Sequence, residues 1–149
     1  MTELRFYHLT LRTLEQTLPA LLEKSLERGW KALVLTDGDE RAQALSQHLW
    51  TYHPDSFLPH GTPQDGHAAH QPVLITSEDD RANNAHVLFL TAGTTSPAMG
   101  DYALACDLFD GNDPDAVAAA RQRWRAAKEA GHSLTYWQQN ERGGWEKKA

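Results

Sequence analysis

Short apolar runs that alternate with helical patterns are the feature of this sequence that most restricts its fold. Residues 32–35, 73–75 and 87–90 are continuous apolar runs, typical of strands buried on both faces of a parallel sheet. Leucines between Leu14 and Leu26 recur every three or four residues, which predicts an amphipathic helix. Strands that alternate with helices form a mostly parallel sheet with helices on both faces. We therefore expect a three-layer α/β/α fold with about five strands and right-handed crossovers.

Helix-capping residues, prolines and further apolar runs predict the other helices and strands. Residues 4–9 and 102–109 predict two further strands, and residues 134–137 predict an edge strand. Pro19 interrupts the first helical pattern, which predicts a kink or a later helix start. Asp113 and Pro114 signal the start of the last helix, which is expected to run to about residue 131. We expect one domain over residues 1–137 and a polar C-terminal tail over 138–149, which either frays or docks through Trp145.

Composition narrows the class of protein. Hydrophobic residues make up 40% of the 149 residues and charged residues 23%, which predicts a globular chain rather than a disordered one. No apolar run is long enough to span a bilayer, and no apolar segment follows the N-terminal residues as in a signal peptide. The single cysteine, Cys106, excludes an internal disulfide framework. The expected location is the cytoplasm, without membrane contact.

Charge is distributed unevenly along the chain. Residues 1–120 contain 7 basic and 17 acidic side chains, a net charge of −10, whereas residues 121–149 contain 7 basic and 3 acidic ones, a net charge of +4. An acidic body argues against a protein that coats nucleic acid, which needs a broad basic face. The pattern favours a small basic patch that binds one acidic partner.

A sheet of this kind raises the question of a nucleotide site. Phosphate-binding loops need closely spaced glycines, and neither G-x-G-x-x-G nor the Walker pattern occurs in the sequence. Asp37 and Asp39 follow the second strand, where they are expected to cap the helix that carries Leu45 and Trp50. The runner-up reading is a small nucleotide- or magnesium-dependent enzyme that uses these two carboxylates. The favoured fold is Rossmann-like without a nucleotide site.

Other chemistry has weak support. His53, His60, His67 and His70 share a loop, but such spacing is a poor signal for zinc, so we expect solvated histidines and no metal. Cys106 lies in an apolar run and is expected to be a buried, inert thiol. The nucleophile motif G-x-S-x-G is missing. We expect no cofactor and no catalytic residue.

Two regions favour interactions with other proteins. Arg121, Trp124, Arg125 and Lys128 recur at helical spacing and share one face, which suits an acidic peptide with an aromatic residue, or a stacked base. The alternative for this helix is a solvated basic end with Trp124 in the core. Direct binding of single-stranded DNA here is a third reading, against which the net charge of −6 counts.

The second region is the loop around Phe57. An apolar Phe-Leu-Pro run in a loop either folds back onto the core or forms a partner surface.

These regions together resemble the chi subunit family of bacterial DNA polymerase III. The resemblance extends in order from Phe6 to about Trp137. The matching motifs are Leu49-Trp50, Ser56-Phe57-Leu58-Pro59-His60, Pro72-Val73, Asn83 or Asn84 before residues 87–90, Asp107, Ala120-Arg121-Gln122-Arg123-Trp124-Arg125 and Ala130-Gly131.

The resemblance implies a non-catalytic accessory subunit with two protein partners. The psi subunit, which joins chi to the clamp loader, would bind at Trp50, Phe57, Pro59 and His60, and a helicase is an alternative partner there. The acidic C-terminal tail of single-stranded DNA-binding protein would bind at Arg121, Trp124, Arg125 and Lys128. Leu108 or Phe109 would supply the apolar part of that pocket, although the family's Phe-Val-Pro is replaced here. Contact with DNA would then be indirect.

Overall fold

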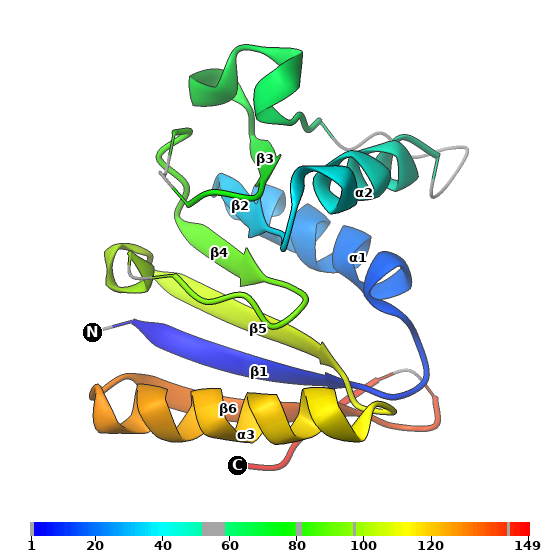
Figure 1. The fold of residues 1–149 in the computed structure, drawn as a ribbon, viewed down its shortest axis with the longest axis vertical. Helices are drawn as coiled ribbons and strands as arrows, with labels where there is room; N and C mark the ends of the chain where they lie inside the picture. Colours follow the sequence, from blue (N-terminus) through cyan, green and yellow to red (C-terminus); the bar gives the residue numbers. More distant parts are fainter. Residues whose placement is uncertain (1, 52–58, 80–81, 97, 143) are drawn as a thin grey trace.

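The computed structural model describes residues 2–51, 59–79, 82–96, 98–142 and 144–149. The chain folds into one β-sheet that is flanked by α-helices. Within these residues the sheet has seven strands in the order β3-β2-β4-β5-β1-β6-β7 (Figure 1). The strands are β1 (Glu3–Leu9), β2 (Ala32–Leu35), β3 (Val73–Thr76), β4 (Val87–Leu90), β5 (Leu104–Asp110), β6 (Ser133–Gln139) and β7 (Trp145–Lys147). The helices are α1 (Leu14–Glu27), α2 (Asp39–Thr51) and α3 (Pro114–Glu129), with short 3-10 turns η1 (Pro63–Asp65), η2 (Ala68–His70) and η3 (Met99–Asp101).

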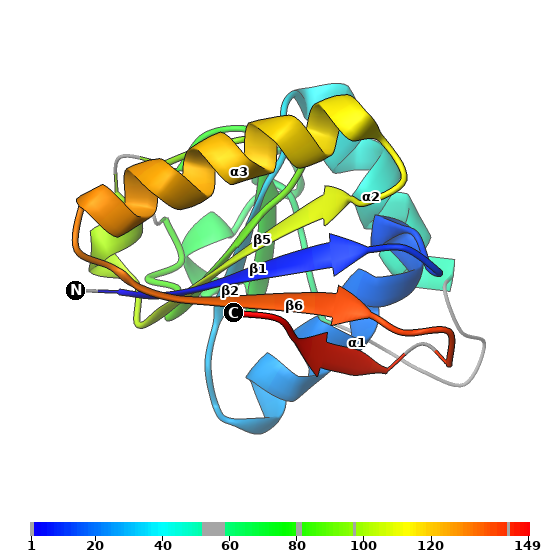
Figure 2. The ribbon, with the colours of Figure 1, turned by 90° about the horizontal axis from the view of Figure 1, so that it is seen from below.

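Two apolar layers separate the helices from the sheet. Leu18 and Leu22 of α1 and Leu45 of α2 are buried against one face. Ala120 and Ala127 of α3 are buried against the other, where their small side chains allow a close approach. Figure 2 shows α3 above the sheet and α1 below it. The predicted three-layer α/β/α fold is therefore confirmed.

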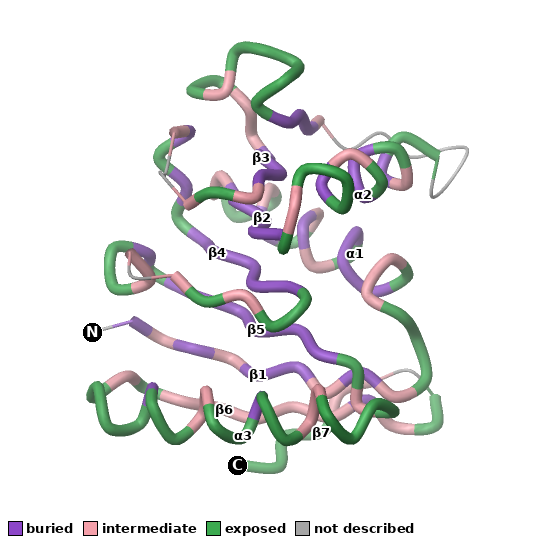
Figure 3. Tube along the Cα trace, viewed as in Figure 1, coloured by how far each residue is buried: buried purple, intermediate pink, exposed green. Residues whose placement is uncertain are grey.

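Parallel pairing explains why these strands could be predicted from continuous apolar runs in the sequence. Strands β1 to β6 are paired in parallel, and β4 and β5 are buried along nearly their whole length (Figure 3). A parallel strand covered on both faces needs apolar residues at successive positions. In the described part of the chain, no helix is both long and apolar enough to cross a membrane.

The prediction of about five strands, with an edge strand at 134–137, is wrong at the C-terminal side. That segment is part of β6, which lies between β1 and β7, and β7 pairs antiparallel with it. Trp145 of β7 packs edge-on against Tyr7, with ring centroids 4.9 Å apart. The last residues thus extend the sheet instead of fraying.

Gln139 at the end of β6 holds the loop that follows β1. Its side chain is buried, and its Oε1 accepts hydrogen bonds from the backbone N–H groups of Thr10, Leu11 and Arg12 at 3.0–3.1 Å. Because one buried amide oxygen accepts all three hydrogen bonds, it ties the loop after β1 to the end of β6.

Pro19 lies inside α1, which continues through it. Proline has no N–H, so the carbonyl oxygen of Glu15 loses its usual helical partner. His48 of α2 replaces it, because its Nε2 donates to that oxygen at 2.7 Å. This hydrogen bond replaces the one that proline cannot donate, and it connects α1 to α2.

Candidate functional site

A buried ion pair fixes the position of α3 on the sheet. Arg123 donates from Nε to Oδ2 of Asp107 at 2.6 Å and from Nη2 to Oδ1 at 3.0 Å. The side chains are 14% and 3% exposed, so this bidentate pair is shielded from water. Burial raises the pKa of the Asp107 carboxyl, and the Arg123 guanidinium acts in the opposite direction. The pair sets which residues of α3 face outward.

Aromatic rings fill the space between α3 and the sheet. Trp124 contacts Phe6 and Tyr136 edge-on, at 5.4 and 5.9 Å between ring centroids. Phe109 lies 5.2 Å from His8 and 6.0 Å from Tyr136. Trp124 is half-buried and packs against this core layer. Of the two alternatives for this helix, the structure favours the one in which Trp124 packs against the core, and part of its ring stays accessible.

The three other predicted cations of α3 are exposed. We call Arg121, Arg125 and Lys128 the α3 basic face. Burial lowers the pKa of His8 and raises the pKa of Tyr136, and the nearby Arg121 charge acts to lower the pKa of each group. The arrangement combines cations in solvent with aromatic edges below them, which can hold an anion that carries a ring.

His8 is a member of this site that sequence reasoning missed. Its Nδ1 lies 2.6 Å from the hydroxyl oxygen of Tyr136. Burial lowers the pKa of His8, as does Arg121, while a hydrogen bond with the Gly111 backbone and the charge of Asp110 raise it. No local pattern could have indicated this cluster, because parallel pairing of β1 with β5 and β6 creates it.

Gly111 makes the close approach to His8 possible. Its N–H donates to the carbonyl oxygen of Leu9 at 2.7 Å. A Cβ atom at this position would lie 2.0 Å from Cδ2 of His8 and 2.6 Å from that same oxygen. Only glycine fits here, so the end of β5 is drawn against His8.

Of the two candidates for an apolar pocket wall, the structure favours Phe109. Leu108 is 2% exposed and belongs to the core layer beneath α1 and α2, on the far side of the sheet from α3. Successive side chains of a strand point to opposite faces, so Leu108 cannot share a pocket with Arg121. Phe109 lies on the α3 side, but it is buried and acts as a support for Tyr136.

The second predicted surface lies at the end of α2. Trp50 is 51% exposed and packs against His60, with ring centroids 4.5 Å apart. His60 is only 6% exposed and its Nε2 donates to the Ser46 carbonyl at 2.9 Å, so it supports Trp50 from behind instead of forming the surface. Pro59 is half-buried, and Phe57 lies outside the described residues.

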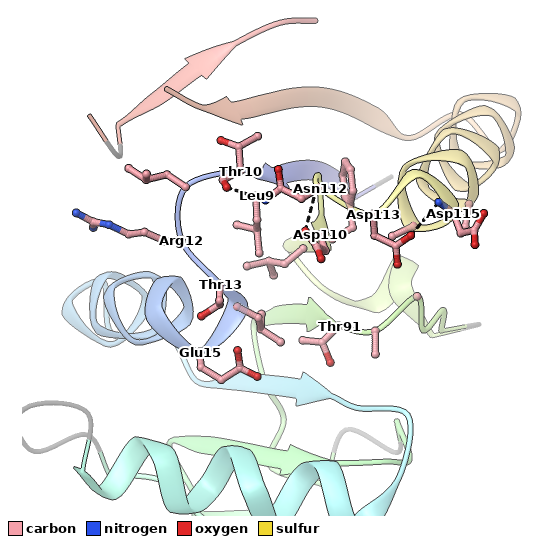
Figure 4. Close-up of a pocket in the computed structure, with 18 of the residues that line it drawn as sticks. Leu9, Thr10, Arg12, Thr13, Glu15, Thr91, Asp110, Asn112, Asp113 and Asp115 are labelled. Atoms are coloured by element: carbon pink, nitrogen blue, oxygen red, sulfur yellow. Dashed lines mark hydrogen bonds between the residues drawn. The ribbon is translucent and has the colours of Figure 1, made fainter. Parts of the chain in front are cut away.

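A crevice of about 680 Å³ lies where β1 and β5 end (Figure 4). The chain leaves these neighbouring strands for α1 and α3 on opposite faces, the usual place for a ligand in an open α/β sheet. Glu15, Asp110, Asp113 and Asp115 line it together with Arg12, Arg41 and Arg123, of which Arg123 is paired with Asp107. The carboxylates oppose phosphate, and the side chains of Thr13 and Asp113 already accept from N–H groups at the two helix starts.

Asp37 and Asp39, the candidate residues for a nucleotide or magnesium site, bind other side chains of the protein. Asp37 pairs with Arg41 at 3.6 Å, and Asp39 accepts a hydrogen bond from Ser77 at 2.6 Å. Cys106 is buried, as predicted, and burial raises the pKa of its thiol to about 12. Among the described residues, no group of three or more histidine, cysteine or acidic side chains is placed to hold a metal ion.

Comparison with known proteins identifies the family of this chain. The family model for the DNA polymerase III chi subunit, HolC, matches residues 1–135. A protein of Rickettsia prowazekii (strain Madrid E), named "Probable DNA polymerase III subunit chi", is 33% identical over 94 residues, 63% of this chain and 57% of that protein. The DNA polymerase III subunit chi of Escherichia coli (strain K12) is 24% identical over 127 residues, 83% and 84% of the two chains. This chain belongs to the DNA polymerase III chi subunit family.

Proposed function

We propose that this chain is a non-catalytic accessory subunit that links DNA polymerase III to single-stranded DNA-binding protein. The α3 basic face would bind the acidic C-terminal tail of that protein, and the Trp50 surface would bind the psi subunit. The single observation that carries the proposal is Arg121, exposed beside the aromatic cluster under α3. The work would take place in the cytoplasm, and contact of this face with DNA would be indirect.

The chemistry of the α3 basic face supports a peptide that ends in a free carboxylate. A guanidinium binds a carboxylate through two parallel N–H donors, which lysine cannot do. Arg125 and Lys128 lie on the same exposed side of α3 and would attract further acidic residues of the tail. The accessible edges of Trp124 and Tyr136 offer apolar contact to a terminal ring.

The exposed ring of Trp50 supports a second, separate surface. A half-exposed tryptophan fixed from behind by a buried histidine is a rigid apolar anchor, the kind of residue that dominates protein interfaces. Pro59 would extend this surface toward the psi subunit, and Phe57, which the resemblance also implies for this contact, lies outside the described residues. A helicase is the other partner that fits this expectation.

Arg121→Ala tests the tail proposal, by titration calorimetry with a synthetic acidic tail peptide. Losing a hydrogen bond to a charged group costs about 1.5–3 kcal/mol, so we expect affinity to fall by about tenfold to a hundredfold. The matched control is Arg41→Ala, which removes an exposed arginine of α2 and should leave affinity unchanged. Equal affinities of Arg121→Ala and the unmodified protein would contradict the proposal.

Trp50→Ala tests the second surface, by size-exclusion chromatography with purified psi subunit. We expect the complex to be lost while tail-peptide binding is retained. Loss of both activities would show that the two surfaces are not separate.

A further inference from the structure

An aromatic pocket lies on the face of the sheet opposite to α3, between α1 and the β6–β7 edge. Its volume is about 220 Å³. Three of the chain's five tryptophans, Trp30, Trp137 and Trp145, line it together with Tyr7. Each of these indoles is half-buried, so each leaves part of its surface accessible. The pocket belongs to neither surface described above.

Positive charge surrounds this pocket. Arg5, Lys24 and Arg28 contribute to its lining, and none of its lining residues is acidic. Lys24 on the last turn of α1 and Arg28, the residue after its end, are exposed, and the Arg28 guanidinium lies 5.3 Å from the centroid of the Trp30 ring. Arg5 is paired with Glu3 at 2.9 Å. The crevice at the ends of β1 and β5 differs, since four carboxylates line it.

The aromatic rings are held in place. Trp145 packs edge-on against Tyr7, and the indole Nε1 of Trp137 donates to the Thr135 hydroxyl at 2.9 Å. The antiparallel pairing of β7 with β6 holds Trp137 and Trp145 on adjacent strands. A ligand can therefore use these rings with little loss of side-chain freedom on binding.

We propose that this pocket, lined by Trp30, Trp137 and Trp145 with Lys24 and Arg28, is a weak binding site for single-stranded nucleic acid. Cations beside aromatic rings are the combination that binds single strands, because phosphates contact the charges and unstacked bases stack on the rings. Duplex DNA has no free base faces to offer, so the site selects single strands. The acidic remainder of the chain keeps the interaction weak and confined to a few nucleotides.

The number of cations sets the expected salt dependence. Arg5 is already paired with Glu3, so Lys24 and Arg28 are the two cations, among the described residues that line the pocket, that can contact phosphates. With two phosphate contacts, the logarithm of the binding constant should fall against the logarithm of salt concentration with a slope of about −1.4, and neutralising Lys24 and Arg28 should remove most of this salt dependence.

The test is fluorescence anisotropy of a labelled oligothymidylate of about 12 nucleotides with the full chain at low salt. The double variant Lys24→Gln and Arg28→Gln is expected to lose affinity by about tenfold or more. Arg125→Gln is the matched control on the α3 basic face and should keep full affinity. An abasic oligomer of equal length should bind about tenfold more weakly, because stacking is lost.

Several results would overturn the proposal. They are an absence of oligonucleotide binding at low salt, equal binding of the abasic oligomer, or a loss of affinity in Arg125→Gln instead of in the double variant. Binding of the tail peptide to the same double variant is measured in parallel and should be unchanged. This measurement distinguishes failure of the nucleic-acid proposal from failure of the proposed tail-binding site.

Discussion

Removal of the Arg123 side chain should destabilise the protein strongly, because it leaves a buried carboxylate without a counterion. Asp107 is 3% exposed and its two oxygens are bound by the guanidinium at 2.6 and 3.0 Å. Removing one partner of such a pair costs about 3–5 kcal/mol. For a domain of this size that corresponds to a decrease of about 10 °C in Tm. We expect this loss for Arg123→Met.

The pH dependence of that loss identifies its cause. Burial raises the pKa of the Asp107 carboxyl, and without Arg123 nothing offsets burial. When the pKa of a carboxyl is higher in the folded than in the unfolded state, the group favours folding at a pH below its pKa in the unfolded state. That contribution to stability is lost as the pH rises through the pKa in the folded state. The deficit of Arg123→Met should therefore be smaller at about pH 4 than at about pH 7.

Urea unfolding followed by circular dichroism, for the single and double variants, is the assay. The double variant Asp107→Leu and Arg123→Met buries no charge and should recover most of the lost stability. A loss below about 1 kcal/mol in Arg123→Met at pH 7, or a deficit that does not shrink in acid, would refute the reasoning.

Three further predictions concern named contacts. His48→Ala should lower the free energy of unfolding by about 1–3 kcal/mol in urea titrations, because the Glu15 carbonyl beside Pro19 loses its substitute partner; an unchanged midpoint would contradict this. Gly111→Ala should lower Tm in a thermal shift assay, because the added methyl group meets the His8 ring; full stability would show that the chain can yield there. Tail-peptide affinity should rise as pH falls from about 7 to 5, because burial and, to a smaller extent, the Arg121 charge lower the pKa of His8, and a bound anion would raise that pKa again. A pH profile that is identical in His8→Leu would contradict that reading.

The layers of this fold could be predicted from sequence because buried parallel strands carry continuous apolar runs. Residues 32–35 and 87–90 are such runs, and both form inner strands that are paired on both sides. The β6–β7 edge was not predictable in the same way. Strands β6 and β7 mix apolar and polar residues, most of them half-buried or exposed. Neither a continuous apolar run nor a strict alternation therefore marks their pairing in the sequence.

The candidate site was predictable only where one helix contains it. Arg121, Arg125 and Lys128 share a face of α3 because helical spacing determines it. The strand positions depended on which face each residue takes, so Phe109 fits and Leu108 does not. His8 joins the site through pairing between strands far apart in sequence, and no local signal marks such a pairing.

The most direct test of the account compares two labelled peptides in fluorescence anisotropy. Both have the same acidic sequence ending in phenylalanine, and one carries a free C-terminal carboxylate whereas the other is amidated. The account predicts micromolar binding of the free peptide that weakens with salt, and at least about tenfold weaker binding of the amide, because Arg121 binds the terminal carboxylate. Equal binding of both peptides, or binding of neither at low salt, would contradict it.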